Sequence, residues 1–149
     1  MKHVVTAEQG HTFVEMILVL AVLSIMTAVP VLHFQTMYDK KQIDYFLEVL
    51  EEDLRAAQQL AYADQEWIYF KNTTETYSMQ KGSFWEEPLQ TRELPEGVSF
   101  QNNTMAFEDI GFKSNGNARK AGTVFIQTPH QSYKLVVLVG KGRIYIEKR

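Results

Sequence analysis

The stretch from Gly10 to Leu32 constrains this chain more than any other. A short polar leader, residues 1–10, ends in Gly10, and an apolar run from Met16 to Leu32 contains no charged residue. Together with His11–Val14, the run is about long enough to cross a hydrocarbon layer of ~30 Å as a helix. One carboxylate, Glu15, stands at its start. A carboxylate in hydrocarbon costs about 2.5–3.5 kcal/mol, so Glu15 is expected to need a cationic partner.

The best candidate for that cation is a new α-amino group, because the run itself contains no Lys or Arg. Cleavage between Gly10 and His11 would create such an amine. It would belong to a neighbouring subunit, since the first residue of a straight helix meets Glu15 only loosely. An ordinary signal peptide would have a small-residue cleavage site after the apolar run, and the sequence has no convincing one. An uncleaved membrane anchor remains an alternative, but it gives Glu15 no role.

The glycine, the spacing, the glutamate and the apolar run resemble the class III signal of type IV prepilins and type II secretion pseudopilins. The resemblance implies that a prepilin peptidase cuts after Gly10 and N-methylates His11. It also implies that Glu15 pairs with an amine during filament assembly. This sequence has His11 where the family usually has Phe. Because the reaction takes place at the backbone, we still expect cleavage.

Composition argues against an enzyme. The chain has 149 residues, which predicts one domain plus an anchor. It has no cysteine, which excludes disulfides, a thiol nucleophile and cysteine metal sites. The four histidines are scattered without metal-ligand spacing, and no phosphate-binding loop or nucleophile elbow is present. We therefore expect no catalytic residues, no cofactor and no bound metal.

Helical periodicity resumes after a polar bridge at residues 35–42. Apolar residues recur at intervals of three and four and predict one buried face: Ile43, Phe46, Leu47, Leu50, Leu54, Ala57, Leu60 and Ala61. The predicted opposite face is acidic, with Arg55 as its main counter-charge: Asp44, Glu48, Glu51, Glu52 and Asp53. This acidic face is interpreted either as solvated or as a docking surface for a basic neighbour. We expect one helix, with residues 11–34 in the membrane or filament core and residues 35–63 against a head.

The period changes to two after residue 66, which predicts a β-rich head over residues 64–149. The expected strands are Trp67–Phe70 and Thr76–Gln80, which pair as a hairpin across Asn72–Glu75, and then Phe84–Trp85, Val98–Phe100, Met105–Phe107, Thr123–Thr128, Tyr133–Val139 and Arg143–Glu147. The strand at residues 133–139 is expected to be largely buried on both faces. Residues 110–112 are expected to lead into a turn at Asn115–Asn117. Pro88 and Pro95–Gly97 are interpreted as turns between the strands. A long helix followed by an antiparallel sheet predicts an α+β fold. This layout agrees with a pilin-like head.

The tail carries a second resemblance. Residues 112–126 and 133–149 are similar to the C-terminus of minor pilins of the Gram-positive competence pilus. Those proteins share a closing strand, a glycine turn and a G-R strand with H-type secretion pseudopilins. The resemblance implies a minor pilin of the pilus that takes up extracellular DNA, with a prepilin peptidase and other major and minor pilins as partners. It also implies one N-terminal span in the cell membrane, and later the pilus at the cell surface. A secretion pseudopilin remains the alternative, because it shares the signal and the head type.

The charge is unevenly distributed along the chain. Residues 1–112 carry seven Lys and Arg against 17 Asp and Glu, whereas residues 113–149 carry eight against one. The candidate DNA-binding residues are Lys141, Arg143, Lys148 and Arg149, near Tyr145. Basic side chains beside an exposed aromatic ring can hold phosphates and stack on bases. Some H-type relatives bind DNA through a G-R-x-R pattern, of which Gly142-Arg143 keeps only the G-R. The alternative is that this segment balances the acidic helix of this or a neighbouring subunit.

Overall fold

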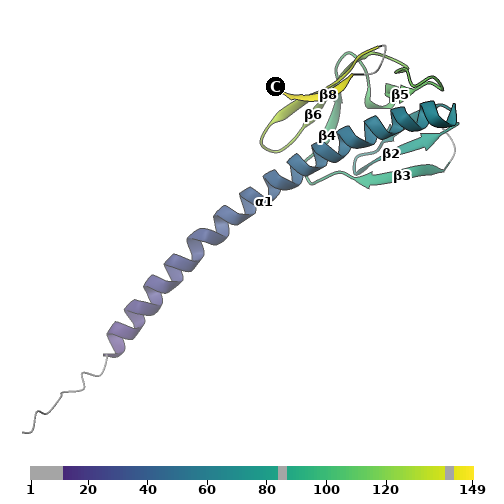
Figure 1. Ribbon diagram of the computed structural model, residues 1–149. Coiled ribbons are helices and arrows are strands. Elements are labelled where there is room, and N and C mark those ends of the chain that lie inside the picture. Colours follow the sequence, from purple (N-terminus) through teal and green to yellow (C-terminus); the bar gives the residue numbers. More distant parts are fainter. Residues whose placement is uncertain (1–11, 84–86, 140–142) are drawn as a thin grey trace, which may run out of the picture. The chain divides into compact units, whose positions relative to one another are not determined.

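A computed structural model describes residues 12–83, 87–139 and 143–149, with side chains except those of residues 28–37 (Figure 1). It divides the chain into two compact units, residues 1–40 and 41–149. The predicted cleavage residues Gly10 and His11 lie outside the described residues, as does Lys141. The fold is α+β with antiparallel sheets, which is consistent with a pilin-like fold.

Helix α1 runs from Phe13 to Asp64. It begins after Thr12, whose Oγ1 accepts a hydrogen bond from the backbone N–H of Glu15 at 3.3 Å. This is the N-cap interaction that threonine commonly makes at a helix start. The helix ends where Gln65 takes a positive φ of 55°, a left-handed conformation that typically follows the last helical turn.

The first sheet has the strand order β3-β2-β1-β5. Strands β1 (Ile68–Asn72) and β2 (Thr76–Lys81) form the predicted hairpin, with Phe70 opposite Met79. The Oγ1 of Thr73 accepts the backbone N–H of both Glu75 and Thr76, which closes the turn between the two strands. The hairpin prediction is therefore confirmed.

Strand β3 (Pro88–Glu93) corrects the interpretation of Pro88 as a turn. The strand lies at the edge of its sheet, beside β2 only. A proline at the start of an edge strand removes no hydrogen bond that the sheet needs. Pro88 therefore fits a strand, although proline usually indicates a turn. The strand expected at residues 84–85 lies outside the described residues.

The second sheet has the order β4-β6-β7-β8, so the head contains two sheets where one was expected. Its strands are β4 (Ser99–Asn102), β6 (Gly122–Gln127), β7 (Ser132–Val137) and β8 (Ile144–Lys148). The three closing strands are confirmed. The expected burial of residues 133–139 on both faces holds only in part, because Leu138 and Val139 follow the strand and are exposed.

The strand expected at Met105–Phe107 is wrong. A short 3-10 helix, η1 (Phe107–Asp109), stands there and leads into the two-residue strand β5 (Gly111–Phe112). The Asp109 carboxylate accepts the backbone N–H of Ala106 at 3.1 Å and so closes the turn. A capping bond of this kind competes with strand pairing. The alternation of apolar residues gave no sign of this bond, so it predicted a strand.

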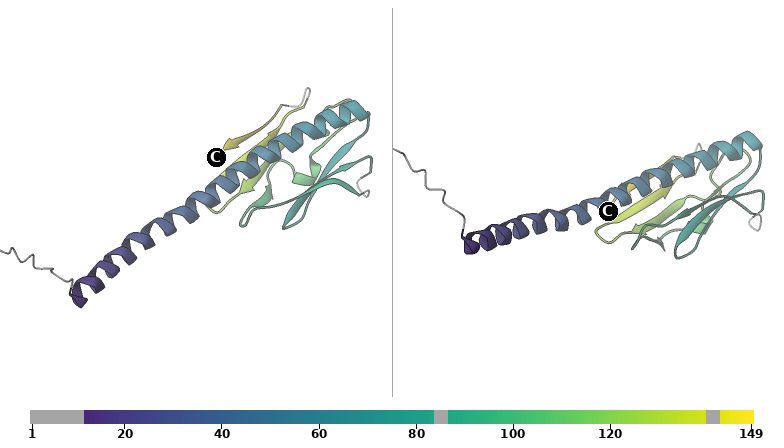
Figure 2. Two further views of the ribbon diagram at one scale, coloured as in Figure 1. Left: turned by 60° about the horizontal axis from the view of Figure 1, so that its bottom comes forward. Right: turned by 90° about the horizontal axis from the view of Figure 1, so that it is seen from below.

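We call the second unit, residues 41–149, the head from here on. In the head, the part of α1 after residue 41 packs against the strands (Figure 2). Seven of the eight residues predicted on its apolar face are buried, and only Leu60 is exposed. An aromatic cluster joins the layers, because Phe46 of α1 contacts Tyr77 of β2 and Phe100 of β4. Phe100 in turn stacks on Phe107 with ring centroids 3.9 Å apart.

Asp53 is predicted on the acidic face of α1, which is interpreted either as solvated or as a docking surface, and the structure buries it instead. Only 7 % of it is exposed. Its carboxylate accepts hydrogen bonds from the Tyr77 hydroxyl at 2.7 Å and from Arg92 Nε and Nη2 at 2.7 and 3.0 Å. Burial and the hydrogen bond to Asp53 raise the pKa of Tyr77 far above its ordinary value. The hydrogen bond to Asp53 also raises the pKa of Arg92. This ion pair ties α1 to the edge strand β3.

Candidate assembly and binding surfaces

Glu15, the predicted assembly residue, lies in the first turn of α1 and is exposed. Thr12 and Glu15 stand three residues apart, at the N-cap and N3 positions of the helix. This is the spacing of a capping box, and a carboxylate here also interacts favourably with the positive end of the helix dipole. Sequence reasoning gave Glu15 only an intermolecular role. The structure adds a local one, which the T-x-x-E pattern could have revealed.

The beginning of α1 presents an apolar surface. Its large exposed side chains are Phe13, Val14, Met16, Ile17, Leu18, Val19, Leu20, Val22, Leu23, Ile25 and Met26. The two side-chain hydroxyls in this stretch make hydrogen bonds within their own helix. Ser24 donates to the Leu20 carbonyl at 2.8 Å, and Thr27 donates to the Leu23 carbonyl at 3.0 Å. An exposed apolar surface of this extent marks a site that another molecule covers.

The predicted membrane-spanning segment at residues 11–34 is not confirmed. Among the residues that the structure describes, no helix combines the length and the apolar character needed to cross a membrane.

The candidate DNA-binding residues do not form one cluster in the described part of the chain. Arg143 stands just before β8, and Lys148 and Arg149 stand at its other end. Arg149 is six residue steps along an extended chain from Arg143, a distance of about 20 Å. The Arg149 guanidinium lies over the Phe125 ring, 4.7 Å from its centroid. Lys148 is exposed.

Several other basic residues of the tail are paired within the head. Lys134 donates to Glu147 at 3.0 Å, and Lys120 donates to Asp109 at 2.6 Å. Arg119 lies 3.6 Å from the same carboxylate. The hydrogen bond from Lys120, together with that from Ala106, lowers the pKa of Asp109. The positive charge of residues 113–149 is therefore partly balanced inside the subunit. The carboxylates that balance it belong to η1 and β8; in the described part of the chain none of these pairs involves the acidic helix that the alternative named.

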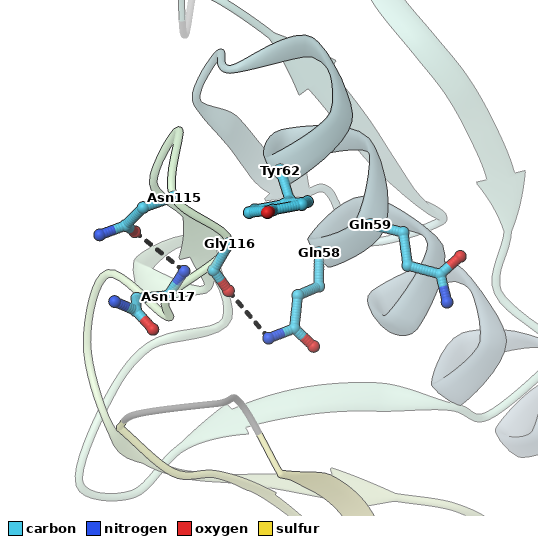
Figure 3. A pocket seen from close by; sticks show the side chains of 6 residues that line it. All are labelled: Gln58, Gln59, Tyr62, Asn115, Gly116 and Asn117. Atoms are coloured by element: carbon cyan, nitrogen blue, oxygen red, sulfur yellow. Dashed lines mark hydrogen bonds between the residues drawn. The ribbon is translucent and has the colours of Figure 1, made fainter.

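Two adjoining surface pockets lie between α1, the turn at Asn115–Asn117 and the start of β8, and sequence reasoning missed them. One pocket, of about 490 Å³, is lined by Gln58, Gln59, Tyr62 and the turn Asn115–Asn117 (Figure 3). The second pocket, of about 470 Å³, shares Gln58 and Gln59 and adds Arg55 and Arg143–Tyr145. We call the two pockets together the α1 groove. Its walls come from three distant segments, so no local pattern in the sequence could indicate it.

The walls of the α1 groove are held by specific contacts. Gln58 Nε2 donates to the Gly116 carbonyl at 2.8 Å, and Asn115 Oδ1 accepts the backbone N–H of Asn117 at 3.1 Å. Gly116 has a φ of +74°, and a Cβ there would lie 3.2 Å from Tyr62 Cβ. Glycine therefore lets the turn approach the helix in the left-handed conformation. In Figure 3 the Tyr62 ring lies above this turn, and Gln59 points away from it.

Helix α1 and the antiparallel strands of the head form an α+β fold, and this fold is consistent with that of pilins. The chain matches no protein-family profile and no solved structure. It is similar to the competence protein ComGD of Bacillus subtilis (strain 168), with 24 % identity over 142 residues. The alignment covers 95 % of each chain. This similarity supports the competence resemblance noted in the tail.

Proposed function

We propose that this chain is a minor pilin of a competence type IV pilus, needed for pilus assembly and for uptake of extracellular DNA. The observation that carries the proposal is the similarity to competence protein ComGD along 95 % of both chains. The exposed apolar side chains at the start of α1 support it, because an assembling subunit needs a surface that its neighbours cover. The role is one of assembly, and the proposal assigns no catalytic step and no cofactor to the chain.

The proposal includes processing and location. A prepilin peptidase cuts after Gly10 and methylates the amine of His11, and Glu15 then sets the position of the subunit against its neighbours. Before assembly the subunit resides at the cell membrane with its head outside the cytoplasm, and afterwards in the pilus at the cell surface. Its partners are the major pilin and other minor pilins.

Deletion of the gene tests the proposed function directly. We expect transformation by added DNA to be lost and to return with the wild-type gene. Gly10→Val should leave an unprocessed precursor that migrates more slowly, whereas Glu15→Ala should be processed but fail to restore pili. Normal transformation in the deletion strain would refute the proposal. Loss of enzyme secretion with normal DNA uptake would instead assign the chain to a secretion system.

Direct DNA binding is a second candidate function, and the surface at the end of β8 favours it. Lys148 is exposed there, and Arg149 presents its guanidinium on an aromatic ring. The head, residues 41–149, should then retard double-stranded DNA, with an affinity that falls steeply with salt. Lys148→Ala with Arg149→Ala should weaken binding more than Arg143→Ala, because Arg143 lies at the other end of the strand. No retardation at low salt would refute direct binding.

A further inference from the structure

The α1 groove has a lining suited to a polypeptide. Its amides come from Gln58 and Gln59 on α1 and from Asn115 and Asn117 on the turn. Each side-chain amide both donates and accepts hydrogen bonds, as does the peptide backbone. Among the described residues, the side chains of Gln59 and Asn117 make no hydrogen bond to another residue. These two amides are therefore available to a ligand that brings both donors and acceptors.

One end of the α1 groove carries the guanidinium of Arg143. In the described part of the chain, Arg143 has no carboxylate within ion-pair distance, whereas Arg55 pairs with Glu51 one helical turn away. Both arginines line the same part of the groove. A guanidinium in this position can accept a carboxylate through two parallel hydrogen bonds.

The surrounding charge disfavours a polyanion such as DNA. Glu48 and Glu52 are exposed on the same helix, and Glu51 lies beside Arg55. A chain of phosphates that extended past Arg55 would approach the Glu51 carboxylate as well as the arginines, and like charges at short range repel. A segment with a single carboxylate needs only Arg143 and avoids that repulsion.

Two exposed tyrosines flank the α1 groove and supply anchoring area. Tyr62 is 70 % exposed and Tyr145 is 40 % exposed, and each lines one of the two parts. Tyrosine and arginine are enriched at the centres of protein interfaces, where they contribute most of the binding energy. The α1 groove has the same composition as such an interface centre, because Tyr62, Tyr145 and Arg143 surround its neutral amides.

We infer that the α1 groove binds a segment of a neighbouring pilus subunit, with one Asp or Glu of that segment paired to Arg143 and its backbone hydrogen-bonded to the groove amides. The inference rests on the proposed function, since it requires a pilus, and it adds the docking surface and the chemistry of the partner segment. Because the proposed function names the major pilin and other minor pilins as partners, the inference assigns this carboxylate to one of them and not to a second copy of this chain.

A photocrosslinking experiment in piliated cells tests the inference with the full-length chain. The photoreactive amino acid p-benzoylphenylalanine replaces Tyr62, which keeps an aromatic ring at the groove. After irradiation we expect an adduct that mass spectrometry identifies as another pilus subunit. Arg143→Glu should reduce its yield at least tenfold, whereas Arg143→Lys should keep more than half. A probe at Tyr45, which is 68 % exposed on the same helix, is the matched control. Any Tyr45 adduct should not respond to Arg143→Glu.

Four outcomes would overturn the inference. They are an adduct between two copies of this chain, an adduct with DNA that nuclease removes, no Tyr62 adduct in cells with normal pili, and a yield unchanged by Arg143→Glu. The proposed function is tested separately, by measuring transformation in the deletion strain. Transformation that depends on the gene together with any of these outcomes would refute the docking site alone.

Discussion

Two stretches of the same helix behave in opposite ways. In α1 before residue 28, the large apolar side chains are exposed, as for Leu20 at 59 %. After residue 41, the apolar face is buried in the core of the head, with Leu50 and Leu54 fully inaccessible. The head therefore completes its own core, whereas the first stretch has an apolar surface that only another molecule can cover. The buried apolar face that stabilises the head therefore lies in the second stretch, and the surface proposed for assembly lies in the first.

The largest expected effect comes from truncating a core residue of the second stretch. Leu50→Ala should destabilise the head, residues 41–149, by about 3–5 kcal/mol, because the deleted methyl groups leave a cavity. Urea denaturation measures this loss. In the full-length chain, Leu20→Ala should change the stability of the head by less than about 0.5 kcal/mol, as exposed positions do, and should instead reduce the number of pili. A large loss of head stability from Leu20→Ala would break the comparison.

The next effect concerns the ion pair that fixes the helix to the edge of the first sheet. Asp53→Ala should destabilise the head by about 2–3 kcal/mol, because it leaves the Tyr77 hydroxyl and Arg92 without their acceptor. This is below the ~3–5 kcal/mol typical of a fully buried pair, since the Arg92 side chain is 39 % exposed. Glu52→Ala, at the exposed neighbouring position, is the matched control and should have almost no effect. Equal effects of the two variants would mean that Asp53 is a solvated residue after all.

The contrast between Asp53 and the apolar face shows what the sequence could predict. Periodicity located the buried face of α1 because seven apolar residues repeat at helical spacing, and alternation located the β1–β2 hairpin and the closing strands. Asp53 stands among other acidic residues, and its partner Arg92 lies 39 residues further on, in a strand that begins with proline. Long-range pairing of this kind leaves no local pattern.

The same reason explains the candidate sites. The signal residues Gly10, His11 and Glu15 lie within six residues of sequence, so a motif can indicate them. Arg143 and Lys148 were grouped because they are close in sequence. An extended strand separates them in space, and Arg143 instead lies in the groove with Arg55. Only the folded chain brings Gln58 to Gly116.

The smallest expected effect is a pH dependence at Asp109. Lys120 and the Ala106 N–H stabilise the ionised carboxylate, so the pKa of Asp109 is lower in the folded head than in the unfolded chain. The unfolded chain therefore binds a proton more readily as the pH falls. The contribution of Asp109 to stability is complete above the unfolded pKa of about 3.9, and it disappears as the pH falls through the lower folded value.

Asp109→Asn should consequently be less stable than the wild-type head at pH 7, and the difference should shrink as the pH falls below 4. Urea denaturation at pH 7 and at pH 3 measures both gaps. Glu108→Gln is the control, because Glu108 is an exposed neighbour on the same short helix, and it should show no such convergence. A gap between Asp109→Asn and wild type that persists at pH 3 would mean that Asp109 acts through the shape of the turn. Since this turn belongs to the head, a gap that closes at pH 3 would show that charge contributes to the stability of the head, in addition to its apolar core.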